Sequence, residues 1–225
     1  MREGGLSRQV MFGALHERFV VGRRTRILSQ HLATLIPVSA KVLDVGCGDG
    51  IIDRLLKQQR PDLSIQGIDV LVRPRTEIPV RMFDGVTIPF PDMTFAVSMF
   101  VDVLHHAANP FSLLKEAARV SRFILIKDHF RDGFLSGSIL RFMDWVGNAR
   151  HGVVLPYNYW LKSQWIQAFT ELQLKVGETK SSLGLYPWPA SLIFERGLHF
   201  VARLEHAEVQ PLSESSRQLG GSSSG

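Results

Sequence analysis

The chain has 225 residues, 45% of them hydrophobic, with one cysteine and a formal net charge of +5. This length and composition suffice for one globular domain with a substantial core, and a single cysteine excludes an internal disulfide. The sequence has no run near the ~20 apolar residues of a membrane span and no charged and then apolar leader, which predicts a cytoplasmic protein.

Residues 1–36 are predicted to form an N-terminal helical segment. Apolar residues recur there at helical spacing, with a break at Gly22 and an end at Pro37. Six arginines stand against two glutamates in this segment, so it supplies most of the net charge. A solvated surface is the simplest interpretation, although RNA or an anionic membrane could also meet this segment. The chain lacks zinc-finger spacing and an aromatic RNA-binding motif, which makes nucleic acid an unlikely partner.

A buried strand leads directly into a glycine loop between residues 42 and 50. The strand is apolar except for Asp44, and three glycines at alternate positions then allow a tight turn and a close approach to a ligand. Apolar residues at helical spacing follow from Ile51, so the loop lies between a strand and a helix, where open α/β sheets bind ligands. An acid before the first glycine would repel phosphate. The loop therefore favours a ligand with an ammonium or sulfonium group over a dinucleotide.

Strands and helices alternate through the rest of the chain, which predicts a mostly parallel sheet. Strands are expected at residues 64–68, 79–83, 95–100 and 122–126, and a helix at 110–119. A further helix capped by Ser163, a strand at 174–179, a short helix between Pro189 and Gly197 and an antiparallel last strand at 199–204 are expected to follow. Serines and glycines dominate from 207 to 225, which predicts a disordered tail after a domain at 37–206.

The stretch Asp44-Val45-Gly46-Cys47-Gly48-Asp49-Gly50 resembles motif I of the class I S-adenosylmethionine-dependent methyltransferases. The resemblance continues to Gly67-Ile68-Asp69-Val70 and to Phe83-Asp84-Gly85. It implies a doubly wound, seven-stranded, mostly parallel α/β sheet of the Rossmann-like type with S-adenosylmethionine as cofactor. In that family the acid corresponding to Asp69 accepts hydrogen bonds from the ribose hydroxyls, and the pair at Asp84 faces the adenine amine. The cofactor-binding residues implied by the resemblance are Asp44, Gly46, Cys47, Gly48, Asp69, Val70, Asp84, Gly85 and Phe100.

Candidate catalytic residues follow the fourth and fifth strands. Leu104-His105-His106-Ala107 resembles a stretch of small-molecule O-methyltransferases in which a histidine is the general base, supported by an acid that here would be Asp128. A histidine suits this role because its ordinary pKa of ~6.5 leaves it partly neutral. His106 is the preferred base, with His105 as an alternative, and both could instead be structural. No cluster has convincing metal spacing, so no metal is expected.

An insertion at residues 130–162 is too apolar to be a free loop. The resemblance implies that it covers the mouth of the site together with the N-terminal helices. It would then be a lid over an apolar or aromatic acceptor, with Trp145, Asn148, Tyr157 and Tyr159 as acceptor-binding residues. Its aromatic residues could otherwise pack on the edge of the sheet.

The sequence therefore predicts a methyltransferase that acts on a small molecule, most simply at an oxygen atom. A first alternative is a membrane-surface protein that binds S-adenosylmethionine and acts on a lipid or quinone. An RNA methyltransferase is a weaker alternative, because residues 100–103 lack the Asn/Asp-Pro-Pro-Tyr type of tetrad found after strand four in enzymes that methylate bases. The oligomeric state and the acceptor are not encoded in any recognisable pattern.

Overall fold

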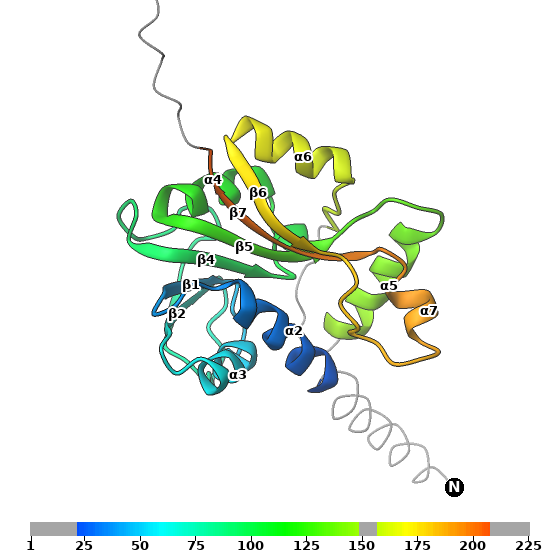
Figure 1. Cartoon of the computed structure of the whole chain (residues 1–225), viewed down its shortest axis with the longest axis horizontal. Helices are drawn as coiled ribbons and strands as arrows, with labels where there is room; N and C mark the ends of the chain where they lie inside the picture. Colours follow the sequence, from blue (N-terminus) through cyan, green and yellow to red (C-terminus); the bar gives the residue numbers. More distant parts are fainter. Residues whose placement is uncertain (1–21, 149–156, 208–225) are drawn as a thin grey trace, which may run out of the picture.

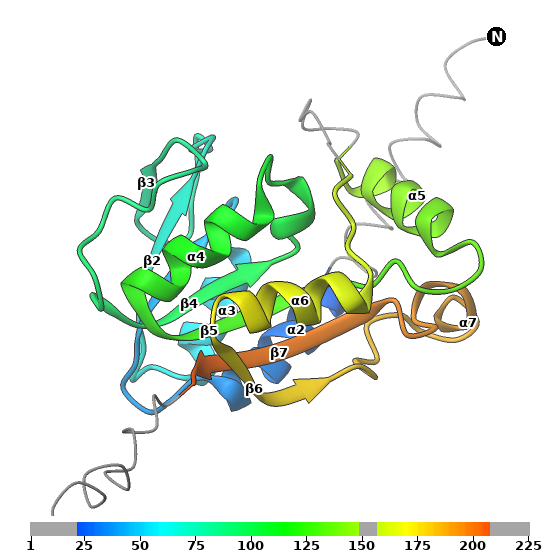
Figure 2. The same ribbon diagram turned by 90° about the horizontal axis from the view of Figure 1, so that it is seen from above.

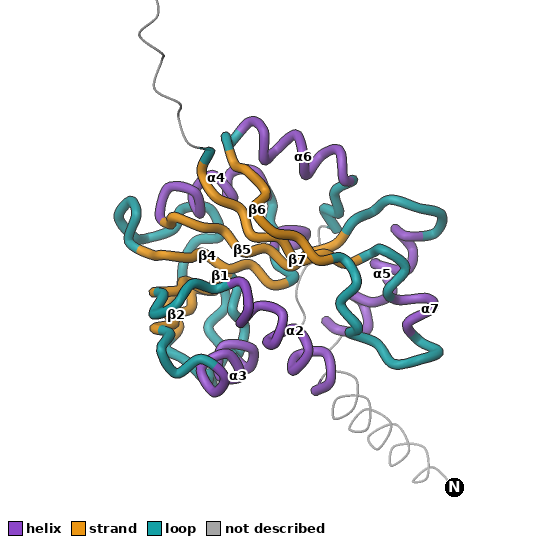
Figure 3. Tube along the Cα trace, in the orientation of Figure 1, coloured by secondary structure: helices purple, strands orange, loops and turns teal. Residues whose placement is uncertain are grey.

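A computed structural model describes residues 22–148 and 157–207 of the chain, and its centre is one seven-stranded sheet with the order β3-β2-β1-β4-β5-β7-β6 (Figures 1 and 3). The strands are β1 (Lys41–Val45), β2 (Ser64–Asp69), β3 (Val80–Met82), β4 (Phe95–Val101), β5 (Ser121–His129), β6 (Leu174–Lys180) and β7 (His199–His206). Strand β7 pairs antiparallel with both of its neighbours, whereas every other pair is parallel. The predicted seven-stranded, mostly parallel sheet is confirmed.

Helices cover both faces of the sheet, as a doubly wound fold requires. Figure 1 shows α4 and α6 on one face and α2 and α3 on the other, and Figure 2 gives the view from above. The helices are α2 (Gly22–Leu35), α3 (Ile51–Gln59), α4 (Pro110–Val120), α5 (Ser136–Asn148), α6 (Lys162–Glu171) and α7 (Ser191–Phe194), with a short 3₁₀ helix η2 (Leu104–His106).

Each face of β1 contributes to its own apolar core because successive side chains point to opposite sides of a strand. Leu43 packs in a cluster with α4 and α6, whereas Val42 packs in a second cluster with α2 and α3. Both side chains are fully buried. Burial on both faces explains why the central strands are almost continuously apolar in sequence.

Most element boundaries differ from the prediction by a residue or two, and two of the differences have a clear cause. Helix α6 begins at Lys162, before the expected cap Ser163, and the Gln164 side chain accepts a hydrogen bond from the Leu161 N–H at 2.9 Å. A glutamine that reaches back to the chain before the helix replaces the serine cap. Strand β5 continues to His129 instead of ending at 126, because β7 pairs with it along that length. No helix within the described ranges combines the length and apolarity needed to cross a bilayer.

Candidate active site

The glycine loop connects the end of β1 to α3 and depends on the absence of side chains. Gly46 donates a hydrogen bond to Ile68 O at 2.7 Å, has φ of 77°, and a Cβ there would lie 2.7 Å from both methyl groups of Val103. Gly48 and Gly50 also have positive φ, at 61° and 78°. The backbone is therefore held close to the ends of β2 and β4, where larger residues would not fit.

Asp69 ends β2 and receives the backbone of the loop. Its two oxygens accept hydrogen bonds from Gly48 N at 2.8 Å and Leu71 N at 3.0 Å. A carboxylate has about four lone-pair positions, so Asp69 retains capacity to accept hydroxyl donors of a ligand. Next to it, Val70 is 57% exposed and lies 3.0 Å from where a Cβ of Gly85 would be. Together these residues present a polar and an apolar surface at the ends of β2 and β3.

Asp84 stands at the start of the loop after β3. Its Oδ1 accepts hydrogen bonds from Val86 N at 2.8 Å and Thr87 N at 2.7 Å, and these bonds lower the pKa of the exposed carboxyl. The carboxyl is thus ionised and held at the same edge of the sheet as Asp69.

Asp44 and Asp53 form a buried pair beneath the loop. Asp44 is 3% exposed and Asp53, in the first turn of α3, is fully buried; Asp44 Oδ1 and both oxygens of Asp53 lack hydrogen-bond partners. Burial, followed by the charge of Asp53, raises the pKa of Asp44 well above its usual range. Two carboxyl groups without a basic partner attract a cation, so this end of the loop suits an ammonium or sulfonium group and not a phosphate.

These features fit S-adenosylmethionine, with carboxylates for its cationic and ribose groups and an exposed valine for its adenine. Two predicted cofactor residues have restricted roles. The Phe100 side chain is fully buried in the core on β4, so only its backbone could meet a ligand. Burial and then the charges of Asp44 and Asp53 raise the pKa of Cys47, so its thiol remains protonated in the loop.

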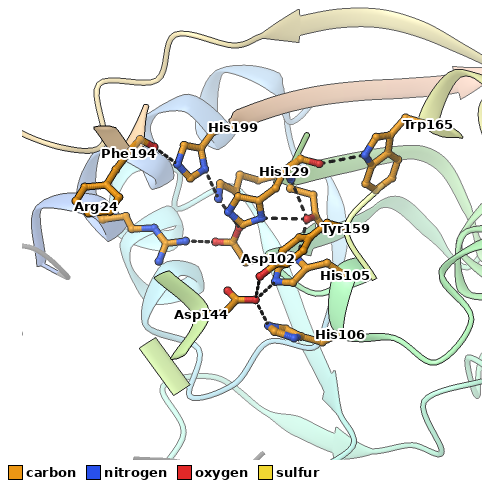
Figure 4. Close-up of polar contacts among 12 residues, drawn as sticks. Arg24, Asp102, His105, His106, His129, Asp144, Tyr159, Trp165, Phe194 and His199 are labelled. Atoms are coloured by element: carbon orange, nitrogen blue, oxygen red, sulfur yellow. Dashed lines mark hydrogen bonds and ion pairs between the residues drawn. The ribbon is translucent and has the colours of Figure 1, made fainter. Parts of the chain in front are cut away.

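His105 follows β4, and its ring lies between the carboxylates of Asp128 on β5 and Asp144 on α5. Figure 4 shows the side of the ring that faces Asp144. Its Nδ1 is 2.7 Å from Asp128 Oδ1, and its Nε2 is 3.3 Å from Asp144 Oδ2. Burial lowers the pKa of His105, but Asp128 and Asp144 outweigh burial and raise it to about 10. His105 is therefore an imidazolium with both nitrogens engaged, and it is 1% exposed.

His106 has a different environment although it is the next residue. Its side chain is 22% exposed, and its Nε2 lies 4.0 Å from Asp144 Oδ2. Burial and the charge of His105 lower its pKa, so the ring is neutral at pH 7. The expected pairing of His106 with Asp128 is wrong in geometry: the 3₁₀ turn of η2 points His105 toward β5, and Asp128 bonds to His105 instead.

The insertion contributes Asp144 from α5 and Tyr159 from the segment after it. The Tyr159 hydroxyl donates a hydrogen bond to Asp144, and the Tyr159 ring stacks on His105 with centroids 5.1 Å apart. Burial raises the pKa of Asp144, but its contact with His105, the charge of His105 and the bond from Tyr159 together outweigh burial, so the net direction is downward. An ionised carboxylate of the insertion thus meets the histidines (Figure 4).

The predicted acceptor-binding residues differ in how they lie relative to the contact between Asp144 and the histidines. Trp145 is 61% exposed on α5, beside Phe142, and does not line the buried side of the helix. Tyr159 is 4% exposed, so its hydroxyl serves Asp144 and is not open to an acceptor. The Tyr157 ring is 6.2 Å from that of Tyr159. The side chain of Asn148 lies outside the described part of the structure.

A second polar layer lies behind the histidines and was not predicted. Asp102, which follows β4 with φ of 57°, bonds to Arg24 of α2 and to Lys127 of β5. Lys127 is fully buried and also contacts His199 Nδ1 at 3.2 Å. The signal for this layer was the charged pair Lys127-Asp128 inside a buried strand. The partners on α2 and β7 could not be read from the sequence because they are distant along the chain.

Within the part of the chain that the structure describes, two groups of side chains bring possible metal ligands within 4.8 Å of one another: His105 with Asp128 and His129, and His105 with His106 and Asp144. In the first group Asp128 Oδ1 is bonded to His105 and lies 3.2 Å from His129 Nδ1. In the second, His105 forms the ion pair with Asp144. We assign no metal to either group, because these carboxylates and imidazoles already pair with each other.

Comparison with known proteins gives matches to methyltransferases. Residues 16–178 match the family described as "Methyltransferase domain". The 27-O-demethylrifamycin SV methyltransferase of Amycolatopsis mediterranei is 26% identical over 113 residues, 44% of this chain and 41% of that protein. The trans-aconitate 2-methyltransferase of Methylobacterium nodulans is 33% identical over 107 residues, 43% of this chain and 40% of that protein. The matches thus span about two fifths of either relative.

Solved structures extend the likeness to nearly the whole described fold. A chain in the complex between the Trm112 methyltransferase activator of Haloferax volcanii and a methyltransferase superposes with a TM-score of 0.61 and 16% identity, covering 87% of this chain and 93% of that chain. Other similar structures are described as S-adenosylmethionine-dependent methyltransferases. At such identities the likeness concerns the fold alone. Because the family match covers most of the 225 residues, this chain belongs to the methyltransferase domain family.

Proposed function

We propose that the chain transfers a methyl group from S-adenosylmethionine to an oxygen atom of a small-molecule acceptor, with His106 as the general base. The observation that carries this proposal is the division of charge between two adjacent histidines. His105 faces a carboxylate at each ring nitrogen, whereas His106 is partly exposed and has a lowered pKa. Of these two histidines, only His106 then has a lone pair that can accept a proton at neutral pH.

His105 and Asp128 have a supporting role in this proposal. The buried pair keeps a positive charge next to the ring of His106, with ring centroids 4.0 Å apart. That charge keeps His106 deprotonated near neutral pH, where a base must be free to act. Asp128 therefore acts on the base indirectly, through His105.

The cofactor would be held by residues at the ends of β1, β2 and β3. Asp44 would face the cationic part, Asp69 the ribose and Val70 the adenine, with the glycine loop allowing close approach. S-adenosylmethionine supplies an electrophilic methyl group on a sulfonium, so the chain needs no nucleophilic side chain. The residues of the chain orient the acceptor, exclude water and remove its proton.

A small-molecule acceptor is supported by the names of the two curated relatives, which denote a rifamycin derivative and trans-aconitate. The position of Asp144 and Tyr159 against the histidines supports a site covered by the insertion. Such a covered site suits a small molecule better than a polymer, because little space remains open beside His106, which is 22% exposed.

The test measures methyl transfer from radiolabelled S-adenosylmethionine to a panel of phenols, alcohols and carboxylic acids. For any acceptor that is methylated, His106→Ala should lower kcat about 10²–10⁴-fold without changing cofactor affinity. His105→Ala is the matched neighbour and should mainly destabilise the fold, since it removes the cationic partner of the buried Asp128 carboxylate. Full activity of His106→Ala across the pH range would rule out His106 as the general base.

A membrane-dissolved acceptor, such as a lipid or quinone, is a second candidate because of the surface around α5 and α7. These helices lie side by side beyond the end of the sheet (Figures 1 and 2). Seven large hydrophobic side chains there are more than half exposed: Phe134, Leu135, Phe142, Trp145, Trp188, Leu192 and Ile193. Exposed aromatic side chains in such numbers are typical of proteins that touch a bilayer.

Sedimentation of the full chain with vesicles separates the two candidates. Binding to phosphatidylcholine vesicles with anionic phosphatidylserine, reduced by a Phe134→Ser and Trp188→Ser double variant, would favour the membrane-dissolved acceptor. Val38→Ser is the control, because Val38 is 82% exposed and precedes β1 at the opposite end of the sheet. No sedimentation at low salt would favour an acceptor dissolved in water.

A further inference from the structure

Asp144 is the residue of the insertion that reaches both histidines of the site. Its Oδ2 lies 3.3 Å from His105 Nε2 and 4.0 Å from His106 Nε2, and it accepts a hydrogen bond from the Tyr159 hydroxyl. Its side chain is 12% exposed. Helix α5 thus brings one carboxylate against both histidines.

The proton that leaves the acceptor makes His106 a cation, so the charges around this ring determine how good a base it is. His105 opposes that cation from η2. Three carboxylates favour it, and the effect of Asp144 on the His106 pKa is the largest, ahead of Asp128 and Asp102. Asp128 bonds to His105, and Asp102 bonds to Arg24 and Lys127, whereas Asp144 lies against both His105 and His106.

The remaining groups near the ring do not take over this role. His129 of β5 has a pKa well below its usual range, because of burial and then the charge of Lys127, and is therefore neutral. Tyr159 is also neutral, since burial and its bond to Asp144 raise its pKa. Arg24 of α2 is a cation, but it pairs with Asp102. Asp144 is the carboxylate best placed to balance the charge that develops on His106.

We propose that Asp144 is a positioning residue that makes His106 an effective base and couples the seating of helix α5 to proton removal. This inference rests on the proposed function. The acceptor O–H bond breaks, an N–H bond forms on His106, and the Asp144 carboxylate stabilises the resulting imidazolium. The 4.0 Å separation is an ion-pair distance and not a hydrogen bond, so the effect is electrostatic and is lost when α5 moves away.

Proton NMR titration of the full chain without acceptor tests this directly. The His106 Cε1–H signal is identified by its loss in His106→Gln, and its pKa is compared in the parent chain, Asp144→Asn and Tyr159→Phe. We expect Asp144→Asn to lower the His106 pKa by about 1, because an opposite charge at ~4–6 Å is removed. Tyr159→Phe keeps the carboxylate and should leave the pKa within a few tenths of its parent value.

The titration also separates the charge of Asp144 from a change in His105. Asp128 should keep His105 protonated in Asp144→Asn, so the His105 signal should not titrate below pH ~8. Asp144→Glu is expected to restore most of the His106 pKa, which a purely structural role would not require. An unchanged or raised His106 pKa in Asp144→Asn, or an equal fall in Tyr159→Phe, overturns the proposal.

A kinetic measurement then distinguishes this inference from the proposed function. With any acceptor that the parent chain methylates, Asp144→Asn should lower kcat about 10-fold or more and shift the acidic limb of the kcat profile to lower pH. A rise in acceptor KM alone, with kcat and the acidic limb unchanged, contradicts the role of Asp144. Loss of activity in His106→Ala with a normal Asp144→Asn variant would leave the proposed function intact and refute only this inference.

Discussion

At the scale of single residues, Asp53 has unfavourable surroundings for an ionised carboxylate. Burial raises its pKa to about 6, although the neighbouring Asp44 carboxyl lowers it in part. A carboxyl whose pKa is higher in the folded than in the unfolded chain binds its proton more tightly when folded. Its contribution to stability is therefore fully present below the unfolded pKa of ~3.9 and is lost as pH rises through the folded pKa.

Asp53→Asn should remove this pH dependence. The side chain cannot ionise, so the free energy of unfolding should fall less between about pH 4 and pH 8 than in the parent chain, by about 2–3 kcal/mol. Urea unfolding at a series of pH values measures the difference. Glu171→Gln on the exposed face of α6 is the control. The same change of unfolding free energy with pH in Asp53→Asn and the parent chain would show that Asp53 does not cause the pH dependence.

Gly46 should be the least replaceable glycine of the loop. In Gly46→Ala the left-handed backbone costs about 1–2 kcal/mol, and the contact with Val103 adds about 1–3 kcal/mol. Gly197→Ala is a matched control, because its φ is 72° and a Cβ there would meet nothing within 4 Å. Adding Val103→Ala should recover only the packing part. Equal losses of unfolding free energy in Gly46→Ala and Gly197→Ala would argue against the contact.

The candidate cofactor-binding residues could be predicted from the sequence because each lies in a short stretch that combines an apolar strand with a glycine. Asp44 and Asp69 lie at or near the ends of strands, each two residues from a glycine. The partner of Asp128 could not be chosen, because His105 and His106 are neighbours and only the direction of each side chain in the 3₁₀ turn distinguishes them. Asp144 joins the site through tertiary packing of α5, which no local pattern predicts.

At the scale of elements, ion pairs connect the end of β5 to α2 and to the residue that follows β4. Asp102 accepts bonds from both Arg24 and Lys127, and of these two cations only Lys127 is fully buried. Burial lowers the pKa of Lys127, and Asp102 opposes this effect. The stability of the connection therefore depends mainly on the carboxylate that the buried lysine needs.

Asp102→Asn should destabilise the fold more than Arg24→Ala. The first change leaves a buried ammonium without its carboxylate, which costs about 3–5 kcal/mol. The second removes a partner that is 32% exposed, so we expect about 1 kcal/mol. Adding Lys127→Met to Asp102→Asn should recover much of the loss, as measured by urea unfolding. Equal effects of the two single changes would contradict this account.

Element type was more predictable than element boundaries. Apolar periodicity identified the strands and helices that pack on the sheet, because burial on one or both faces imposes that pattern. The start of α6 depends on one hydrogen bond that the Leu161 N–H donates to the Gln164 side chain, and the length of β5 depends on pairing with β7. Both are set by contacts that periodicity does not contain.

At the scale of the whole molecule, the sheet topology gathers the site at one edge. Strands β1, β2, β4 and β5 run parallel, so their carboxyl ends bring together Asp44, Asp69 and the histidines after β4. The cationic and anionic groups near the histidines pair with one another, whereas Asp44 and Asp53 have no basic partner among the described residues. Positive and negative charges are therefore balanced at the carboxyl ends of β4 and β5, whereas carboxyl groups predominate at the carboxyl end of β1.

This asymmetry predicts how ligand binding stabilises the chain. A ligand with an ammonium group must compete with protons bound to Asp44 and Asp53, so S-adenosylhomocysteine should bind more tightly as pH rises from about 6 to 8, by up to about tenfold per pH unit. At 100 times its Kd it should add about 2.7 kcal/mol to the unfolding free energy, seen as a higher Tm. 5′-Methylthioadenosine, which lacks the amino acid part, should bind with little pH dependence, and NAD should leave the Tm unchanged. A pH-independent Kd for S-adenosylhomocysteine, or the same pH slope for both adenosyl ligands, would show that the acidic end of the sheet does not receive the ammonium group.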